Sequence, residues 1–211
     1  MKVEPFPVPA EPVEVEETIK RSRFITRIER VERGEQARAM LTRLREAHPA
    51  ARHHCLAFAA GRPGCTRDIG ASDDGEPAGS AGRPMLNVLL GSGVGQLAAV
   101  VIRYSGGIKL GVGGLVRAYG GGVKLALAQL VTEPFVPMVS LSLSCDYSDL
   151  ALITHQLERA GGAVLAKDYR DRIHLTLNLP QRTLAAFSQA LSDGSRGRLM
   201  LMSSDGTPLI R

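Results

Sequence analysis

The sequence predicts an α+β protein of two domains. Its 211 residues exceed the length of one typical domain. Apolar residues alternate in some segments, as in strands, and recur at spacings of three and four in others, as in helices. Residues 133–137, Glu-Pro-Phe-Val-Pro, form a rigid break between two such patterns. We therefore expect an extended tail at 1–12, a first domain at 13–132, a linker at 133–137 and a second domain at 138–211.

The first domain is expected to be an α+β layer with a mixed strand order. Its predicted elements are, in order, strands at 13–15 and 23–31, a helix at 34–48, a strand at 52–60, a long polar loop at 61–82, a helix at 84–90, a strand at 97–104 and a helix at 113–130. The loop is too long for a simple connection, and loops of that length are often functional.

The second domain has an order of elements that is easier to recognise. Its predicted elements are a strand at 139–145, a helix at 148–160, strands at 163–169 and 172–179, a helix at 181–191 and a last strand at 198–202. The order β-α-β-β-α-β is that of a ferredoxin-like domain. The name describes the topology only, because the segment has no set of cysteines that would hold an iron–sulfur cluster.

Composition favours a cytoplasmic protein. The chain is 44% hydrophobic and 22% charged, as globular proteins are. No segment approaches the roughly 18 consecutive apolar residues of a membrane span, so we expect no membrane partner. The first residues show no secretory leader, and three scattered cysteines fit a reducing compartment better than a disulfide framework.

Positive charge is concentrated in the first domain. Residues 1–132 carry 18 Lys and Arg against 13 Asp and Glu, whereas residues 133–211 carry eight of each. Residues 77–132 contain no acidic residue at all. The basic residues of that stretch are Arg83, Arg103, Lys109, Arg117 and Lys124. Such a local field attracts polyanions or acidic protein surfaces, although chance segregation on a solvated face is the alternative.

A glycine-rich stretch overlaps this basic region. Eleven of the 23 glycines lie between residues 91 and 122. The strand at 97–104 ends in Arg103 and Tyr104, and a glycine loop with Lys109 follows before a helix begins near Gly113. Backbone N–H groups at such a helix start bind anions. No phosphate loop of the G-x-x-x-x-G-K-[ST] type is present. Residues 111–115 are similar to the phosphate loop of galactokinase-type small-molecule kinases, which keeps an enzyme that binds a phosphorylated ligand as an alternative.

The acidic residues of the long loop have two interpretations. Asp73, Asp74 and Glu76 can form a metal site or an acid–base pair, or they can tie down the loop through turns and ion pairs with Arg83 or Arg103. We favour the structural role, because the loop has no His or Cys at ligand spacing. Zinc binding near residues 53–55 and Cys65 is disfavoured for lack of a C-x-x-C pair. We therefore predict no metal, no cofactor and no catalytic residue.

The predicted binding surface combines the basic residues with the glycine loop. Arg117 and Lys124 lie seven residues apart and hence on one helical face, where they can contact phosphates, and Tyr104 can stack on a base. Alternatively, Arg103 and Arg117 pair with the acidic loop, and residues 120–122 serve close helix packing. The candidate residues for nucleic-acid or anion binding are Arg83, Arg103, Tyr104, Lys109, Gly111, Gly113, Gly114, Arg117 and Lys124.

Two long strings of sequence closely resemble the signatures of the YigZ/IMPACT family. They are SDDGEPAGSAGRPML at 72–86 and RYSGGIKLGVGGLVRAYGG at 103–121, supported by residues 22–25 and 53–55. The resemblance covers about residues 15–130. Small departures at Ala78, Ser80 and Ser105 do not affect it.

The resemblance implies fold more directly than function. It implies a first domain like domain four of elongation factor G and a second, ferredoxin-like domain like that factor's domain five. Eukaryotic members regulate translation, and a role linked to nucleic acid or the ribosome has been inferred for bacterial members. We therefore expect a non-enzymatic protein that binds RNA or the ribosome. A protein–protein adaptor is a further alternative, and the second domain's sheet is a possible contact for another protein.

Overall fold

The computed structural model describes residues 4–203 and divides the chain into two compact units. The first unit spans Phe6–Phe135 and the second contains the described residues from Val136 onward. The division falls inside the predicted linker at 133–137. Of the predicted tail and second domain, residues 1–3 and 204–211 lie outside the described part of the chain.

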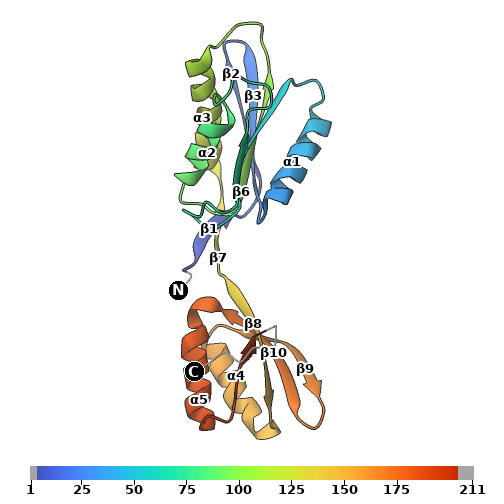
Figure 1. Cartoon of the computed structure of the whole chain (residues 1–211), viewed down its shortest axis with the longest axis vertical. Coiled ribbons are helices and arrows are strands. Elements are labelled where there is room, and N and C mark those ends of the chain that lie inside the picture. Colours follow the sequence, from blue (N-terminus) through green and yellow to red (C-terminus); the bar gives the residue numbers. More distant parts are fainter. Residues whose placement is uncertain (1–3, 204–211) are drawn as a thin grey trace. The chain divides into compact units, whose positions relative to one another are not determined.

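The first domain is built on a five-stranded antiparallel sheet (Figure 1). Its strands are β2 (Val13–Ile19), β3 (Ser22–Arg30), β4 (His53–Ala59), β5 (Ile69–Ser72) and β6 (Leu97–Tyr104), in the spatial order β2-β3-β6-β4-β5. Strand β6 is central and is buried at every position except its last. This explains the unbroken apolar run at 97–102, because both faces of the strand are covered.

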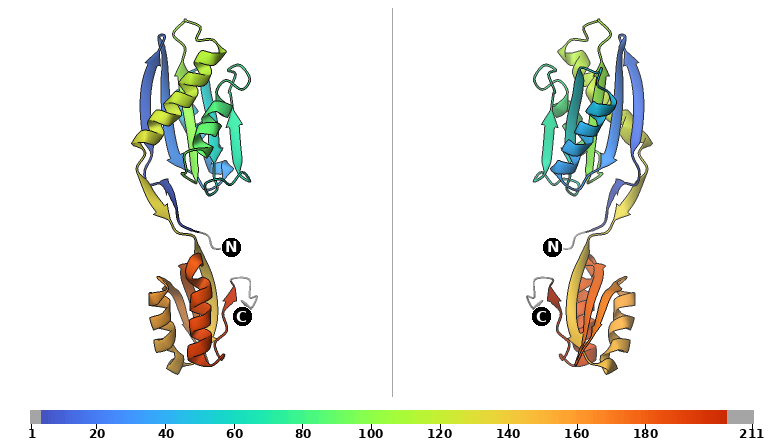
Figure 2. Two further views of the ribbon diagram at one scale, coloured as in Figure 1. Left: turned by 90° about the vertical axis from the view of Figure 1, so that its left-hand side faces the viewer. Right: turned by 90° about the vertical axis from the view of Figure 1, so that its right-hand side faces the viewer.

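Helices cover both faces of this sheet. They are α1 (Gly34–Ala47), α2 (Gly82–Leu90) and α3 (Val112–Gln129). Helix α1 packs on one face around Met40, and α2 and α3 pack on the other around Met85 and Tyr119, giving three layers (Figure 2). Among the described helices, none combines the length and apolar character needed to cross a bilayer.

Three short strands differ from the sequence-based expectation. Strand β1 (Phe6–Pro9), within the predicted tail, pairs with β7 (Thr132–Phe135), which overlaps the predicted linker. Both segments contain proline, which is tolerated in strands that lie at the edge of a sheet. Strand β5 lies within the predicted loop at 61–82 and pairs with β4 at the edge of the sheet. The tail, the linker and the long loop are therefore more ordered than predicted.

The glycines inside α3 include one that close packing requires. A Cβ atom at Gly122 would lie 2.4 Å from Oγ1 of Thr26 on β3, so only glycine lets the helix approach the sheet there. A Cβ at Gly121 would meet nothing within 4 Å. The packing explanation therefore applies to Gly122 and not to the whole glycine run.

The second domain has the predicted ferredoxin-like order. Its elements are β8 (Met138–Cys145), η1 (Tyr147–Asp149), α4 (Leu150–Arg159), β9 (Ala163–Tyr169), β10 (Ile173–Pro180), η2 (Gln181–Thr183), α5 (Leu184–Ser195) and β11 (Met202–Ser203). The antiparallel sheet has the order β11-β8-β10-β9. Alternate residues of β8 and β10 form a core with α4 and α5. The last strand is described at 202–203, so it shares only residue 202 with the predicted 198–202.

Candidate functional site

The first carboxylate of the acidic loop caps a helix. Asp73 follows β5, and its side chain accepts backbone N–H bonds from Gly79, Ala81 and Gly82 at 2.7, 3.0 and 2.8 Å. Gly82 begins α2, so Asp73 satisfies free donors of that helix from nine residues earlier in the chain. Burial alone would raise the pKa of Asp73, but the three backbone donors outweigh it and the net shift is downward.

The second carboxylate joins the loop to β4 and α1. Asp74 contacts the guanidinium of Arg45 and accepts the backbone N–H of His54 at 2.7 Å. Its own carbonyl oxygen lies 2.9 Å from Nδ1 of His53. Asp74 is thus engaged on three sides, although its ionic partner is Arg45 and not the expected Arg83 or Arg103.

The third carboxylate lies in a buried cluster. Oε1 of Glu76 accepts hydrogen bonds from Nη1 of Arg103 and from the hydroxyl of Tyr119, both at 2.7 Å. Glu76 and Arg103 are each only 8% exposed, and Tyr119 is fully buried. The Arg103 guanidinium also lies 5.5 Å from the ring centre of Phe24. Arg103 is therefore enclosed by its own partners, which favours the alternative offered by the sequence, pairing with the acidic loop, over contact with phosphate.

The buried cluster does not contain an activated nucleophile. Burial raises the pKa of the Cys55 thiol to about 12, and this thiol donates to the carbonyl oxygen of Asp73 at 3.0 Å. Burial likewise raises the pKa of Tyr119 far above its usual range. Both groups stay protonated at neutral pH, whereas a nucleophilic cysteine works as the thiolate. Within the cluster both groups therefore act as hydrogen-bond donors.

A serine connects this cluster to the glycine loop. The hydroxyl oxygen of Ser22 accepts from Nη2 of Arg103 at 3.3 Å and from the backbone N–H of Gly106 at 3.2 Å. A Cβ atom at Gly106 would lie 1.9 Å from the carbonyl oxygen of Arg21. Glycine is required at this position, because the loop after β6 lies directly against the turn between β2 and β3.

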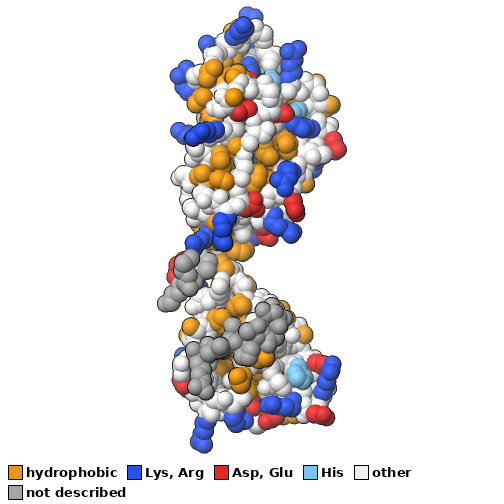
Figure 3. All heavy atoms as spheres, viewed as in Figure 1, with side chains coloured by type: hydrophobic (Ala, Val, Ile, Leu, Met, Phe, Trp, Pro, Cys, Tyr) orange, Lys and Arg blue, Asp and Glu red, His pale blue; other side chains and the backbone are white. Residues whose placement is uncertain are grey.

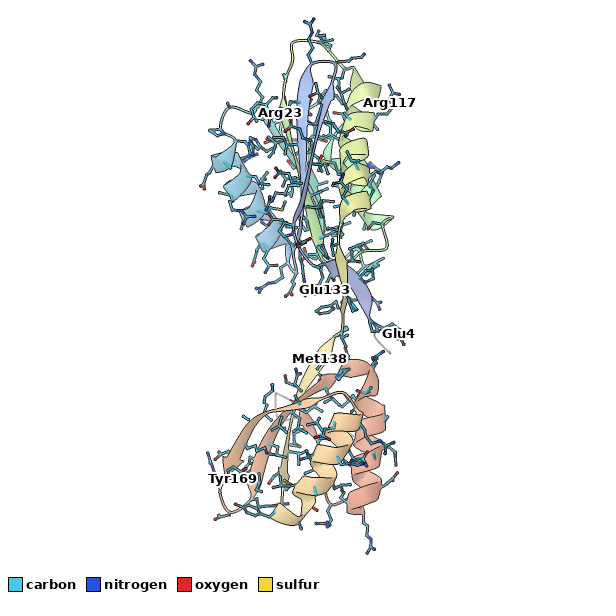
Figure 4. The ribbon with its side chains drawn as sticks, turned by 180° about the vertical axis from the view of Figure 1, so that it is seen from behind. Glu4, Arg23, Arg117, Glu133, Met138 and Tyr169 are labelled. Atoms are coloured by element: carbon cyan, nitrogen blue, oxygen red, sulfur yellow. The ribbon has the colours of Figure 1, made fainter. Side chains whose placement is uncertain are left out.

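This contact forms an exposed basic end of the first domain, which we call the tip. It comprises the β2–β3 turn and the β6–α3 loop with the start of α3. Its basic residues are Lys20, Arg21, Lys109 and Arg117, all exposed. Among the described residues, no carboxylate lies within 4 Å of any of these four cations, and they have no other hydrogen-bond or ring partner. Figure 3 shows Lys and Arg side chains gathered at this end, and Figure 4 labels Arg117 on the outer face of α3.

Apolar side chains and open backbone accompany the tip cations. Ile108 and Val112 are 41% and 59% exposed, although they are large hydrophobic residues. Gly111, with φ of 75°, precedes α3, and neither Gly111 nor Gly113 has an atom near the place of a Cβ. Gly114 lines a small cavity here. A ligand can therefore approach the backbone of the first turn of α3 closely.

Of the remaining predicted residues, Tyr104 directly precedes the β6–α3 loop, and Lys124 and Arg83 are not among the residues that define the tip. The hydroxyl of Tyr104 lies 2.9 Å from Nδ1 of His48, and the guanidinium of Arg23 lies 5.3 Å from the centre of its ring, so one face of the ring is already occupied. Lys124 lines a hollow of about 610 Å³ beside α2 and lies ~10 Å along α3 from Arg117. Arg83 is exposed in the first turn of α2.

Sequence reasoning missed two residues of the tip, Lys20 and Arg21. Both have positive φ, 46° and 62°, in a two-residue hairpin turn where Asn and Gly are usual. Their position between two alternating strands was the signal that could have revealed them. Within residues 4–203, no group of three or more His, Cys, Asp or Glu side chains is arranged to hold a metal ion.

The fold defines a two-domain α+β protein whose first domain carries an acidic loop held by hydrogen bonds and ion pairs. Comparison of the sequence with family models assigns both domains. The model of the Impact N-terminal domain matches residues 20–127, and that of a domain of unknown function, DUF1949, matches residues 143–198. The chain belongs to the IMPACT family.

Its relatives cover nearly the whole chain. It is 48% identical to the IMPACT family member YigZ of Escherichia coli (strain K12), over 95% of this chain and 98% of that protein. It is 34% identical to the IMPACT family member YvyE of Bacillus subtilis (strain 168), over 88% and 84%. A crystal structure of a hypothetical protein matches with a TM-score of 0.73 at 48% identity, covering 95% of this chain and 98% of that one.

Proposed function

We propose that this protein binds RNA, alone or within the ribosome, through the tip of the first domain, as a non-enzymatic factor linked to translation in the cytoplasm. The RNA-linked role expected from the family resemblance agrees with the chemistry of the tip.

The observation that carries this proposal is the lack of acidic partners around Lys20, Arg21, Lys109 and Arg117. Elsewhere in the domain, many arginines are neutralised, as Arg27 is by Glu14 and Glu29. Unpaired cations on one surface bind a phosphate backbone by releasing its condensed counterions. The exposed apolar residues of the tip can pack against riboses and bases.

The expected recognition is tolerant of sequence. The tip has no exposed aromatic residue, and the nearest predicted one, Tyr104, has one face of its ring occupied by Arg23. Phosphate contacts position a protein on RNA without reading bases. We therefore expect binding to many RNAs, with a preference set by their shape.

Binding is tested by co-sedimentation with purified ribosomes and by fluorescence anisotropy with labelled RNA. The test variant is Lys109→Glu/Arg117→Glu, and the matched control is Arg38→Glu/Arg52→Glu, which makes the same charge change at exposed residues without a carboxylate partner within the described part of the first domain. We expect the tip variant to lose at least tenfold in affinity and the control to lose less than threefold. Equal losses in both variants would contradict the proposal.

A protein partner at the second domain's sheet stays a prediction. One feature favours contact with a protein at the β9 end of that domain: Tyr147 and Tyr169 are 66% and 55% exposed and stack with ring centres 6.2 Å apart. Exposed tyrosines are common anchors of protein interfaces. Replacing both by alanine is expected to weaken such a contact without changing RNA affinity, as pull-down and anisotropy would report.

A further inference from the structure

A small cavity lies within the tip, between the β2–β3 turn and the start of α3. Its volume is about 180 Å³. The residues that line it are Ile19, Lys20, Leu110, Gly114, Arg117 and Ala118. A single water needs only about 15 Å³ of such space, so the cavity has room for a larger group.

The walls of the cavity are apolar apart from two cations. Ile19, Leu110 and Ala118 supply hydrocarbon, and Lys20 and Arg117 supply positive charge. Two like charges at one hollow repel each other, and apolar walls screen that repulsion less than water does. No described carboxylate lies within 4 Å of either cation to offset it. An anion held between the two side chains would remove this repulsion.

The donor groups of the two cations suit a phosphate group. A guanidinium donates two parallel hydrogen bonds to phosphate oxygens, and a lysine acts as a point charge toward a third oxygen. The backbone of α3 adds to this, because its first turn has no side-chain cap and Gly113 has no atom near the place of a Cβ. A phosphate carries enough oxygens and charge to satisfy all of these donors, whereas a carboxylate carries only two oxygens.

We propose that this cavity is a binding site for one phosphate group, held by Lys20 and Arg117. The inference refines the RNA-binding function, and the assignment of the phosphate to an RNA backbone rests on that proposed function. The same chemistry would accept the phosphate of a small phosphorylated metabolite. Lys109 belongs to the tip but does not line the cavity, so it contributes to RNA affinity and not to this site.

The site is tested by titrating the full chain with inorganic phosphate and following backbone amide signals by NMR, against sodium chloride at equal ionic strength. We expect saturable shifts at Lys20, Gly113, Gly114 and Arg117. The Lys20→Gln/Arg117→Gln variant is expected to lose them while its other signals remain in place. The matched control, Arg38→Gln/Arg52→Gln, removes two exposed charges outside the tip and is expected to keep them with an affinity within twofold of the unmodified protein.

Shifts scattered over all basic residues, or unchanged in Lys20→Gln/Arg117→Gln, would overturn the site. RNA binding with the expected dependence on Lys109 and Arg117 could then still stand. Two further probes assign the source of the phosphate, namely ribose 5-phosphate and a ten-nucleotide uridine RNA. Phosphate and ribose 5-phosphate binding without RNA binding would support the site and reject the proposed function. RNA that displaces inorganic phosphate from the cavity would support both.

Discussion

Arg103 and Arg117 come from one glycine-rich segment of sequence but have opposite surroundings. Arg103 is 8% exposed and forms hydrogen bonds with Glu76 and Ser22. Arg117 is exposed on α3 and has no carboxylate partner among the described residues. The comparison teaches that counting basic residues locates a charged region, whereas burial decides which charges a ligand can reach.

The two regions also depend on each other. Ser22 bonds both to Arg103 and to Gly106, and Gly106 packs on Arg21 of the tip. The buried ion pair thus holds the loop that carries the exposed cations. Variants of the buried cluster should change stability first, and variants of the tip should change binding first.

The largest effect is expected from Arg103→Ala. Removing one partner of a buried ion pair leaves Glu76 charged and unpaired, which costs about 3–5 kcal/mol of unfolding free energy. Urea unfolding measures this loss. The control is Glu16→Ala, which breaks an exposed pair with Arg23 and should barely move the unfolding midpoint. Similar losses in both variants would contradict the assigned role of Arg103.

Gly106→Ala is expected to disturb both regions. Its Cβ would meet the carbonyl oxygen of Arg21, so the loop must move, at a cost of about 1–3 kcal/mol. RNA affinity should fall as well, because the loop carries Lys109. Gly121→Ala is the control, since its Cβ meets nothing and alanine favours a helix by up to about 1 kcal/mol. Unaltered stability and binding in Gly106→Ala would refute the coupling of the two regions.

The turn variant Lys20→Asn/Arg21→Gly should separate stability from binding. Asn-Gly suits a turn with two positive φ angles, so the protein should gain about 1 kcal/mol in unfolding free energy. It should also bind RNA more weakly, because two tip cations are lost. Thermal unfolding and anisotropy on the same samples measure both quantities. A variant that is more stable and binds RNA equally well would show that the β2–β3 turn does not contact RNA.

The smallest effect concerns pH and Asp73. The pKa of Asp73 is lowered in the folded protein, so its stabilisation is fully present above the unfolded value of about 3.9 and is lost as pH falls through the folded value. The difference in unfolding midpoint between the unmodified protein and Asp73→Asn should be constant near neutral pH and shrink below about pH 4. A difference that is independent of pH would argue against the carboxylate as the cap of α2.

Much of the fold was predictable from sequence, because the alternation of apolar residues in strands and their spacing of three and four in helices indicate which positions are buried. The apolar run of β6 and the order of elements in the second domain are examples. Strands β1 and β7 were missed because prolines in them normally argue against a strand. Strand β5 was missed because it is short, lies at an edge and contains Gly70.

The candidate site was only partly predictable. Lys109 and Arg117 were identified by charge. For Arg103 the sequence left phosphate contact and pairing with the acidic loop as alternatives, and it could not choose between them because Glu76 lies 27 residues earlier. The central position of β6 between β3 and β4 decides the burial of Arg103, and strand order is a long-range property. Lys20 and Arg21 join the tip for the same reason, since the turn meets the glycine loop only in the folded sheet.

The most direct test of the account is the dependence of RNA affinity on salt. The logarithm of the association constant is measured against the logarithm of salt concentration for the unmodified protein and for Lys109→Glu/Arg117→Glu. We expect a steep negative slope for the unmodified protein and a slope flatter by about two in the variant, since each lost phosphate contact removes close to one unit. Equal slopes, or affinity that does not change with salt, would contradict the claim that the unpaired cations of the tip bind the RNA backbone.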